Sequence, residues 1–140
     1  MMTKGINPLC KVADFGLAKM VQEGTKFQTA CGTPTYLAPE VILNPSSSGG
    51  YSDKVDPWSV GIILFSCITN STPFDESEST PLPQRMRERV VDLELLVEQN
   101  VSDDCLDFIG KLLCLDPNLR MSAGECANIT LIIGISDGAN

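Results

Sequence analysis

One apolar stretch, expected to form a helix over residues 56–70, constrains the fold more than any other part of the sequence. Asp56 can cap its N-terminus, and Pro57 fits the first helical position, where its missing N–H costs nothing. Apolar side chains cover nearly every face of this helix: Val60, Ile62, Ile63, Leu64, Phe65, Cys67 and Ile68. A helix that is apolar all round is normally buried. The sequence therefore predicts a buried central helix.

The remaining segments predict a mainly α fold. Ser102 can cap a further helix, whose apolar residues from Cys105 to Leu113 follow helical spacing. Shorter helical segments are expected at residues 40–43, 84–91 and 122–128, and residues 11–14 resemble the end of a short strand. Three other segments are expected to be loops, namely residues 15–39, 44–50 and 72–83.

The charge balance excludes several classes of function. The chain has 140 residues, 18 acidic and 10 basic, for a net charge of −8. This balance argues against nucleic-acid binding, which needs a basic face, and against docking on an anionic membrane. The longest apolar run, residues 60–69, is about half the length needed to span a bilayer, and the first ten residues contain no signal peptide. We therefore expect an intracellular protein of the cytoplasm or nucleus, with its six cysteines reduced.

The sequence contains no histidine. Histidine-based acid/base catalysis, Ser-His and Cys-His nucleophile pairs and histidine metal ligation are thus excluded within these residues. Any chemistry must come from carboxylates, hydroxyls, thiols and the backbone.

Several motifs occur in one order along the chain. D-F-G stands at residues 14–16, G-T-P-T-Y-L-A-P-E at 32–40, D-P-W-S-V-G at 56–61 and D-P-N-L-R at 116–120. D-F-G alone would be weak, but A-P-E at activation-loop distance makes the pattern specific. Over roughly residues 7–127 the chain resembles the C-terminal lobe of a eukaryotic Ser/Thr protein kinase.

The resemblance implies a layout for the whole chain. Residues 1–16 correspond to a strand and the D-F-G motif, 17–40 to the activation segment, 41–128 to the helical subdomain and 129–140 to an atypical apolar tail. The implied fold is the helical C-lobe of the bilobal kinase fold, with a short β remnant before D-F-G. The chain looks closest to the calmodulin-kinase-like group, and residues 29–36 are similar to those of DNA-damage checkpoint kinases that carry a forkhead-associated domain.

The resemblance also assigns roles in ATP- and Mg²⁺-dependent phosphoryl transfer, which needs positioning and charge neutralisation. Asp14 corresponds to the Mg²⁺ ligand, since Mg²⁺ prefers carboxylate oxygen. Phe15 corresponds to the residue that packs beneath it, and Gly16 to a pivot. Taken alone, Asp14 would be interpreted first as a turn-capping residue after a strand.

Residues of the activation segment are expected to receive the protein substrate. Thr33, Pro34 and Tyr36 belong by resemblance to the loop that docks the substrate. Thr29, and more weakly Thr25 and Thr35, are candidate phosphorylation sites, because a phosphate can order the loop against basic residues. Alternatively, Thr33 is an ordinary turn residue and Thr29 a solvated loop residue.

Four residues correspond to structural supports. Glu40 and Arg120, 80 residues apart, match a Glu–Arg ion pair that anchors the activation segment to the helical lobe. Asp56 matches a residue that accepts backbone hydrogen bonds from the catalytic loop. Trp58, the lone tryptophan, is expected in the core, with a binding platform as the alternative.

The sequence also departs from the family pattern. It has no Gly-rich loop, no V-A-I-K lysine and no H-R-D catalytic loop. We therefore expect a truncated domain that is inactive alone and lacks a complete catalytic set. The alternative is a non-catalytic, kinase-derived binding module that engages a kinase or a substrate.

Overall fold

The computed structural model describes residues 11–13, 15, 34–43, 52–74, 81–88, 91 and 93–128. Within these residues the fold is helical, which confirms the mainly α prediction. The elements are a 3₁₀ turn, η2 (Pro34–Tyr36), and six helices, α1 (Pro39–Leu43), α2 (Val55–Thr69), α3 (Leu82–Glu88), α4 (Glu94–Glu98), α5 (Asp103–Leu112) and α6 (Ala123–Ala127).

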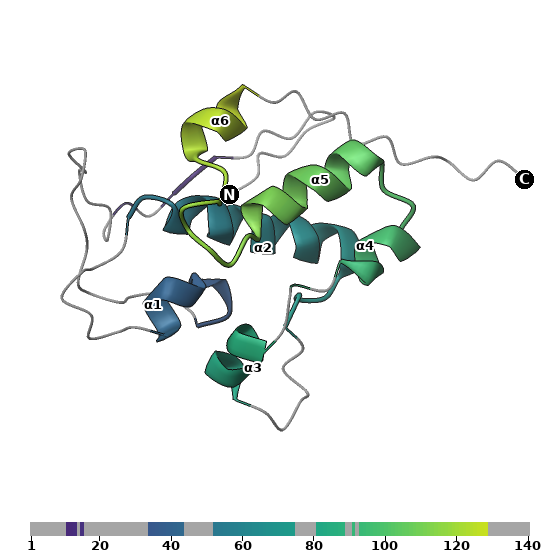
Figure 1. The fold of residues 1–140 in the computed structure, drawn as a ribbon. Coiled ribbons are helices and arrows are strands. Elements are labelled where there is room, and N and C mark those ends of the chain that lie inside the picture. Colours follow the sequence, from purple (N-terminus) through teal and green to yellow (C-terminus); the bar gives the residue numbers. More distant parts are fainter. Residues whose placement is uncertain are drawn as a thin grey trace, which may run out of the picture.

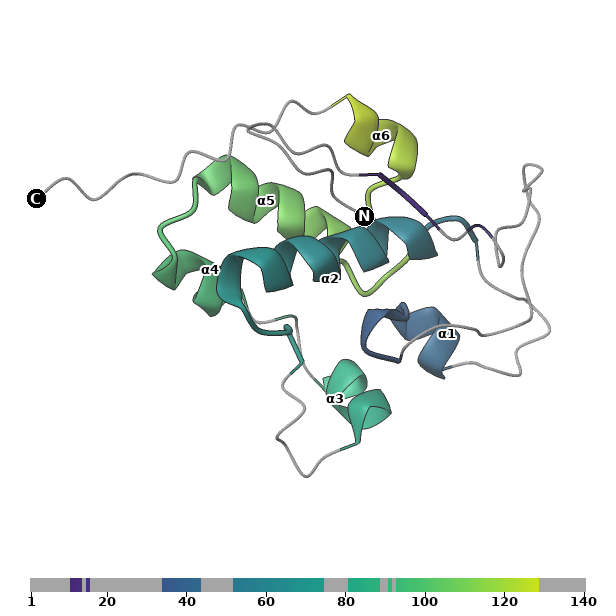
Figure 2. The same ribbon diagram turned by 180° about the vertical axis from the view of Figure 1, so that it is seen from behind.

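Helix α2 runs through the middle of the molecule, with α5 alongside it (Figure 1). Helices α1 and α3 lie together on one side of this pair and α6 lies on the other, and the view from behind shows the same arrangement (Figure 2). The core forms where α2 meets its neighbours. Its fully buried side chains include Trp58, Ile62, Phe65, Met86, Leu96, Cys105, Ile109 and Leu112.

Helix α2 is central, as predicted, but it is not buried all round. Val60 and Ile63 are 46% and 49% exposed, and Cys67 is also exposed. These three side chains recur at helical spacing and form one stripe. Hydrophobic periodicity shows that one face of a helix is apolar. It does not show that other residues of the same chain bury that face.

The start of α2 also differs from the prediction. The N-cap is Lys54, without a side-chain capping bond, so Asp56 lies inside the first turn and is not the cap. Pro57 is still tolerated there, because the first four N–H groups of a helix have no intrahelical partner. The helix ends at Thr69, and Asn70 caps it with a left-handed φ of 53° and an N–H that donates to the carbonyl of Ser66 at 2.9 Å.

The later helices begin at caps that the sequence indicates. Ser102 caps α5, with its side chain accepting a hydrogen bond from the N–H of Cys105 at 3.3 Å, as predicted. Ser122 and Glu125 form a reciprocal capping box at α6. Hydrogen bonds from the side chain and backbone of Ser122 lower the pKa of Glu125.

Some expectations are corrected and others fall outside the described residues. Residues 11–13 are not in a strand, and no strand occurs elsewhere in the described part; a strand requires a ladder with a neighbour. The helix expected at residues 84–91 begins two residues earlier, at Leu82. Most of the loop at residues 15–39, the insert at 44–50 and the tail at 129–140 lie outside the described residues. Among the helices that are described, none is long and apolar enough to cross a membrane.

Candidate functional site

The best-defined polar site surrounds the side chain of Arg120, which is 1% exposed. Nη1 and Nη2 donate to the two carboxylate oxygens of Glu40, at 2.7 and 2.9 Å. Nη1 also donates to the carbonyl of Lys54 (2.9 Å), Nε to that of Cys114 (2.9 Å) and Nη2 to that of Leu115 (3.4 Å). All five N–H groups of the guanidinium are therefore used, which makes its burial tolerable.

The local sequence explains how Arg120 reaches this position. Asp116 closes the turn after α5 by accepting from the backbone N–H and the side-chain amide of Asn118, at 2.9 and 3.0 Å. The N–H of Arg120 then donates to the carbonyl of Asp116 at 3.0 Å. This turn directs the arginine side chain back toward the start of α2 and toward α1.

Lys54 exchanges two hydrogen bonds with Arg120. Its Nζ donates to the backbone carbonyl of Arg120 at 2.6 Å, while its own carbonyl accepts from the guanidinium. Sequence reasoning missed Lys54, and no local pattern could have indicated it. Its contacts are to backbone atoms 66 residues away, and residue types do not encode such contacts.

Trp58 lies against the same guanidinium. The Cζ atom of Arg120 is 5.0 Å from the indole centroid, within cation–π range. Phe74 stacks on the indole with ring centroids 6.1 Å apart and an interplanar angle of 21°. Because Trp58 is 0% exposed, it is a core residue in this structure and presents no binding platform.

The segment that precedes α1 contacts α2. The hydroxyl of Ser59 donates to the carbonyl of Tyr36 at 2.9 Å, which ties η2 to the helix. Ala38 and Pro39 are buried, and Glu40 follows them directly into the bond with Arg120. The Tyr36 side chain itself is 41% exposed, so it stands on the surface beside this anchored segment.

Asp56 lies close in the chain to Lys54 but does not take part in the hydrogen bonds around Arg120. The Asp56 residue is exposed, and no hydrogen bond to its carboxylate is found among the described residues. Partial desolvation, and then the negative charge of Asp53, raise the pKa of Asp56. The structure thus places Asp56 where its charged form is disfavoured.

We expect Asp56→Asn to remove a pH dependence of stability. Because the pKa of Asp56 is raised on folding, the folded state binds more protons than the unfolded state between the two pKa values. The free energy of unfolding therefore falls as the pH rises through that acidic window, and the penalty persists at neutral pH. When the free energy of unfolding from urea titrations is plotted against pH between acidic and neutral values, its slope should be more positive in Asp56→Asn than in the parent chain. Equal slopes in both proteins would contradict the raised pKa.

The other residues predicted for the site are not brought together in the described part of the chain. Phe15 is 68% exposed, and Asp14, Gly16, Thr25, Thr29 and Thr33 lie outside the described residues. Where side chains are described, carboxylates and thiols form no group of three that could hold a metal ion. The fit of Mg²⁺ to Asp14 therefore remains an expectation from the sequence.

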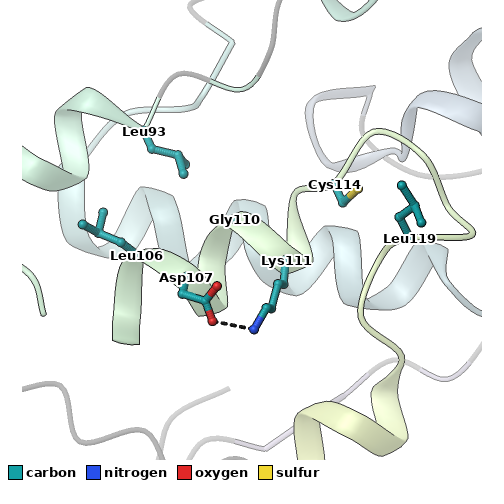
Figure 3. A pocket seen from close by; sticks show the side chains of 7 residues that line it. All are labelled: Leu93, Leu106, Asp107, Gly110, Lys111, Cys114 and Leu119. Atoms are coloured by element: carbon teal, nitrogen blue, oxygen red, sulfur yellow. Dashed lines mark hydrogen bonds and ion pairs between the residues drawn. The ribbon is translucent and has the colours of Figure 1, made fainter. Parts of the chain in front are cut away.

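A pocket of about 420 Å³ lies on α5, and sequence reasoning did not indicate it. Its lining is mostly apolar, with the ion pair between Asp107 and Lys111 (2.6 Å) at its edge (Figure 3). Gly110 also lines the pocket, and a Cβ built on it would lie 3.4 Å from Cδ1 of Leu93. The other lining residues are Leu106, Cys114 and Leu119. None of the residues predicted for phosphoryl transfer lines this pocket.

Comparisons with known proteins agree with the motif order. The protein kinase domain family matches residues 1–132. The chain is 40% identical over 118 residues to the serine/threonine-protein kinase cds1 of Schizosaccharomyces pombe, covering 82% of this chain and 26% of the relative. It is 37% identical over 123 residues to the probable serine/threonine-protein kinase fhkE of Dictyostelium discoideum, covering 88% of this chain and 17% of the relative. The chain thus spans about a quarter or less of these two proteins.

Solved structures show the same relationship. A crystal structure of Rad53 residues 1–466 in complex with AMP-PNP matches with a TM-score of 0.58 and 36% identity, covering 71% of this chain and 26% of that chain. These matches define a protein with the helical kinase architecture. The chain belongs to the protein kinase domain family, and its relatives are Ser/Thr kinases that include the DNA damage response protein kinase DUN1 of Saccharomyces cerevisiae.

Proposed function

We propose that the chain is the activation-segment and substrate-docking part of an ATP- and Mg²⁺-dependent Ser/Thr protein kinase. The observation that carries the proposal is the bidentate bond between Glu40 and Arg120. This bond and the one between Ser59 and Tyr36 hold the C-terminal end of the segment on the helical body. Phosphoryl transfer depends on positioning, and a fixed segment supplies it for the substrate.

Within this proposal the remaining residues take defined roles. Asp14 holds Mg²⁺, which supplies charge neutralisation at the ATP phosphates. Thr33, Pro34 and Tyr36 contact the protein substrate, and the exposed ring of Tyr36 is in keeping with such contact. Phosphorylation of Thr29 or Thr25 orders the segment. The protein acts inside the cell on proteins, without nucleic-acid or membrane ligands.

The 140 residues do not supply every group that the reaction needs. They contain no H-R-D motif and no V-A-I-K lysine, so no aspartate orients the substrate hydroxyl and no lysine contacts the phosphates. We therefore propose that this chain alone is inactive.

A kinase assay tests this directly. The purified chain, incubated with Mg-ATP and a basic peptide containing serine, should transfer no more phosphate than its Asp14→Ala variant. Turnover by the parent chain above that variant would overturn the proposed inactivity, because a competent site would then be present. The matched comparison removes the background from contaminating kinases.

One observation favours a second candidate, a non-catalytic binding module. The stripe of Val60, Ile63 and Cys67 on α2 is apolar and exposed in this structure, as protein-binding surfaces often are. This candidate requires a folded, monodisperse chain that captures a partner without ATP. Binding of ANS together with aggregation would contradict it, because both indicate that the chain lacks fixed packing.

A further inference from the structure

The pocket on α5 follows one face of that helix. Leu106 and Gly110 lie four residues apart on this face, and Cys114 follows just beyond the end of the helix. Leu93 and the ion pair of α5 stand at opposite edges of the pocket (Figure 3). Because Gly110 has no side chain, the pocket is open between Leu106 and Cys114. It therefore has the form of an apolar groove along α5.

Leu119 extends this groove beyond the end of α5. Its side chain lines the pocket and is 75% exposed. Its N–H donates to the carbonyl of Asp116 at 3.1 Å, so the turn after α5 fixes the backbone that carries this leucine. A large apolar side chain held in water beside an apolar groove is typical of a surface that binds another molecule.

The surroundings of the groove are acidic. Residues 93–119 carry one exposed lysine, Lys111, whose charge is balanced by Asp107 at 2.6 Å. Asp103 stands one helical turn before Asp107 on the same face, so negative charge continues along this edge of the groove. The exposed carboxylates of the whole segment are those of Glu94, Glu98, Asp103, Asp104, Asp107 and Asp116. A ligand that matches this surface is cationic as well as apolar.

Helices pack by fitting the side-chain ridge of one into a groove of the other. We propose that the groove on α5 binds a basic amphipathic helix of a partner protein. Leucine-sized side chains of that helix pack over Gly110, between Leu93 and Leu119, and its lysines or arginines face the carboxylates at the edge. The groove uses none of the residues proposed for phosphoryl transfer, so this proposal stands or fails independently of them.

Charge distinguishes this partner from the other candidates for an apolar groove. A second copy of the chain carries the same net charge of −8 and is repelled. Anionic lipid surfaces and nucleic acids are repelled for the same reason. A basic helix gains from both the apolar groove and its acidic edge.

The probe is a fluorescently labelled peptide of leucine and lysine, about twelve residues long, with its leucines at helical spacing. Anisotropy titrations with the full chain should show binding at micromolar to submillimolar concentration. One control peptide has glutamate in place of lysine, and another has alanine in place of leucine. Each should bind at least about tenfold more weakly, because one loses the charge attraction and the other the apolar burial.

Leu119→Asp separates apolar contact from charge. It removes an apolar wall of the groove and adds a negative charge, so attraction by charge alone would strengthen binding of the basic peptide. We expect the affinity to fall about tenfold instead, as loss of a buried leucine contact requires. Ile63→Asp is the matched control, since it makes the same kind of change in the exposed stripe of α2 and should leave the affinity unchanged.

A second pair of variants tests the acidic edge. Asp103→Asn combined with Asp107→Asn should weaken binding of the basic peptide by about threefold to fivefold. Asp53→Asn combined with Asp56→Asn changes the net charge equally, outside the groove, and should have a smaller effect. Equal effects of the two double variants would show that the peptide responds to the overall charge and would overturn the proposal.

Three further outcomes overturn it. They are the absence of binding by the parent chain below millimolar concentration, equal affinities of the parent chain and Leu119→Asp, and a loss in Ile63→Asp as large as in Leu119→Asp. If Leu119→Asp does not fold, Gly110→Leu fills the groove with a residue that favours helix more than glycine does. Binding of the basic peptide by Gly110→Leu as tight as by the parent chain would then exclude the groove as the site.

Discussion

Replacement of Arg120 by alanine should lower the free energy of unfolding by about 3–5 kcal/mol, the range for breaking one side of a buried ion pair. The variant leaves the Glu40 carboxylate without its two donors and removes the donors from three backbone carbonyls. It also removes the cation that covers the Trp58 ring. A small domain is stable by about 5–15 kcal/mol, so a loss of this size removes between about a fifth and the whole of its stability.

Trp58 provides the measurement, because it is the sole tryptophan and lies directly beneath Arg120. Urea unfolding followed by its fluorescence should show a much lower midpoint for Arg120→Ala. Lys111→Ala is the control: it breaks the exposed pair with Asp107, which is worth at most about 1 kcal/mol. An Arg120→Ala midpoint as high as that of the control would contradict the anchoring role.

A double substitution distinguishes the effect of the Glu40–Arg120 ion pair from the cost of leaving one of its charges buried without a partner. Glu40→Ala alone should also be strongly destabilising, because it leaves the Arg120 guanidinium buried without its carboxylate. Glu40→Leu combined with Arg120→Met should recover a large part of the loss, since an apolar pair of similar volume tolerates this site. If the double variant were as unstable as Arg120→Ala, the carbonyl contacts and not the ion pair would dominate.

The ion pair between Glu40 and Arg120 also shows how far the sequence could predict this structure. Glu40 and Arg120 are 80 residues apart, and no periodicity or spacing links them; motif order suggested the pair. The capping of α5 by Ser102 was predictable because a cap depends on neighbouring residues only. The cap of α2 was predicted wrongly, at Asp56, because the helix continues from a turn at residues 52–54, in which the hydroxyl of Ser52 accepts from the N–H of Lys54 at 3.3 Å.

Burial was the part that the sequence predicted least well. Arg85 is one of three arginines on the helix expected at residues 84–91, yet it is buried, and its helix α3 packs against α1, which is distant in sequence. Val60 and Ile63 looked like core residues and are half exposed. In both cases the side-chain environment depends on which elements pack together, and hydrophobic pattern does not contain that information.

The second large effect is expected at Gly61, where α2 packs against α5. A Cβ built on Gly61 would lie 2.8 Å from Cδ2 of Leu113 and 2.9 Å from Cβ of Leu112. The Leu112 Cβ is fixed by the backbone of α5 and cannot rotate away, so the two helices would have to separate. Gly61→Ala should therefore destabilise the chain by about 1–3 kcal/mol through overpacking.

Gly124→Ala is the matched control, because the same change in α6 meets nothing within 4 Å. Alanine is favoured over glycine in helices by about 0.5–1 kcal/mol, so this variant should be slightly more stable than the parent chain. The two substitutions are chemically identical, and only the approach of α5 to α2 can make their effects opposite in sign. Urea unfolding midpoints below the parent value for Gly61→Ala and above it for Gly124→Ala would support this packing. A rise in both would mean that α5 does not approach α2 as closely as the structure has it.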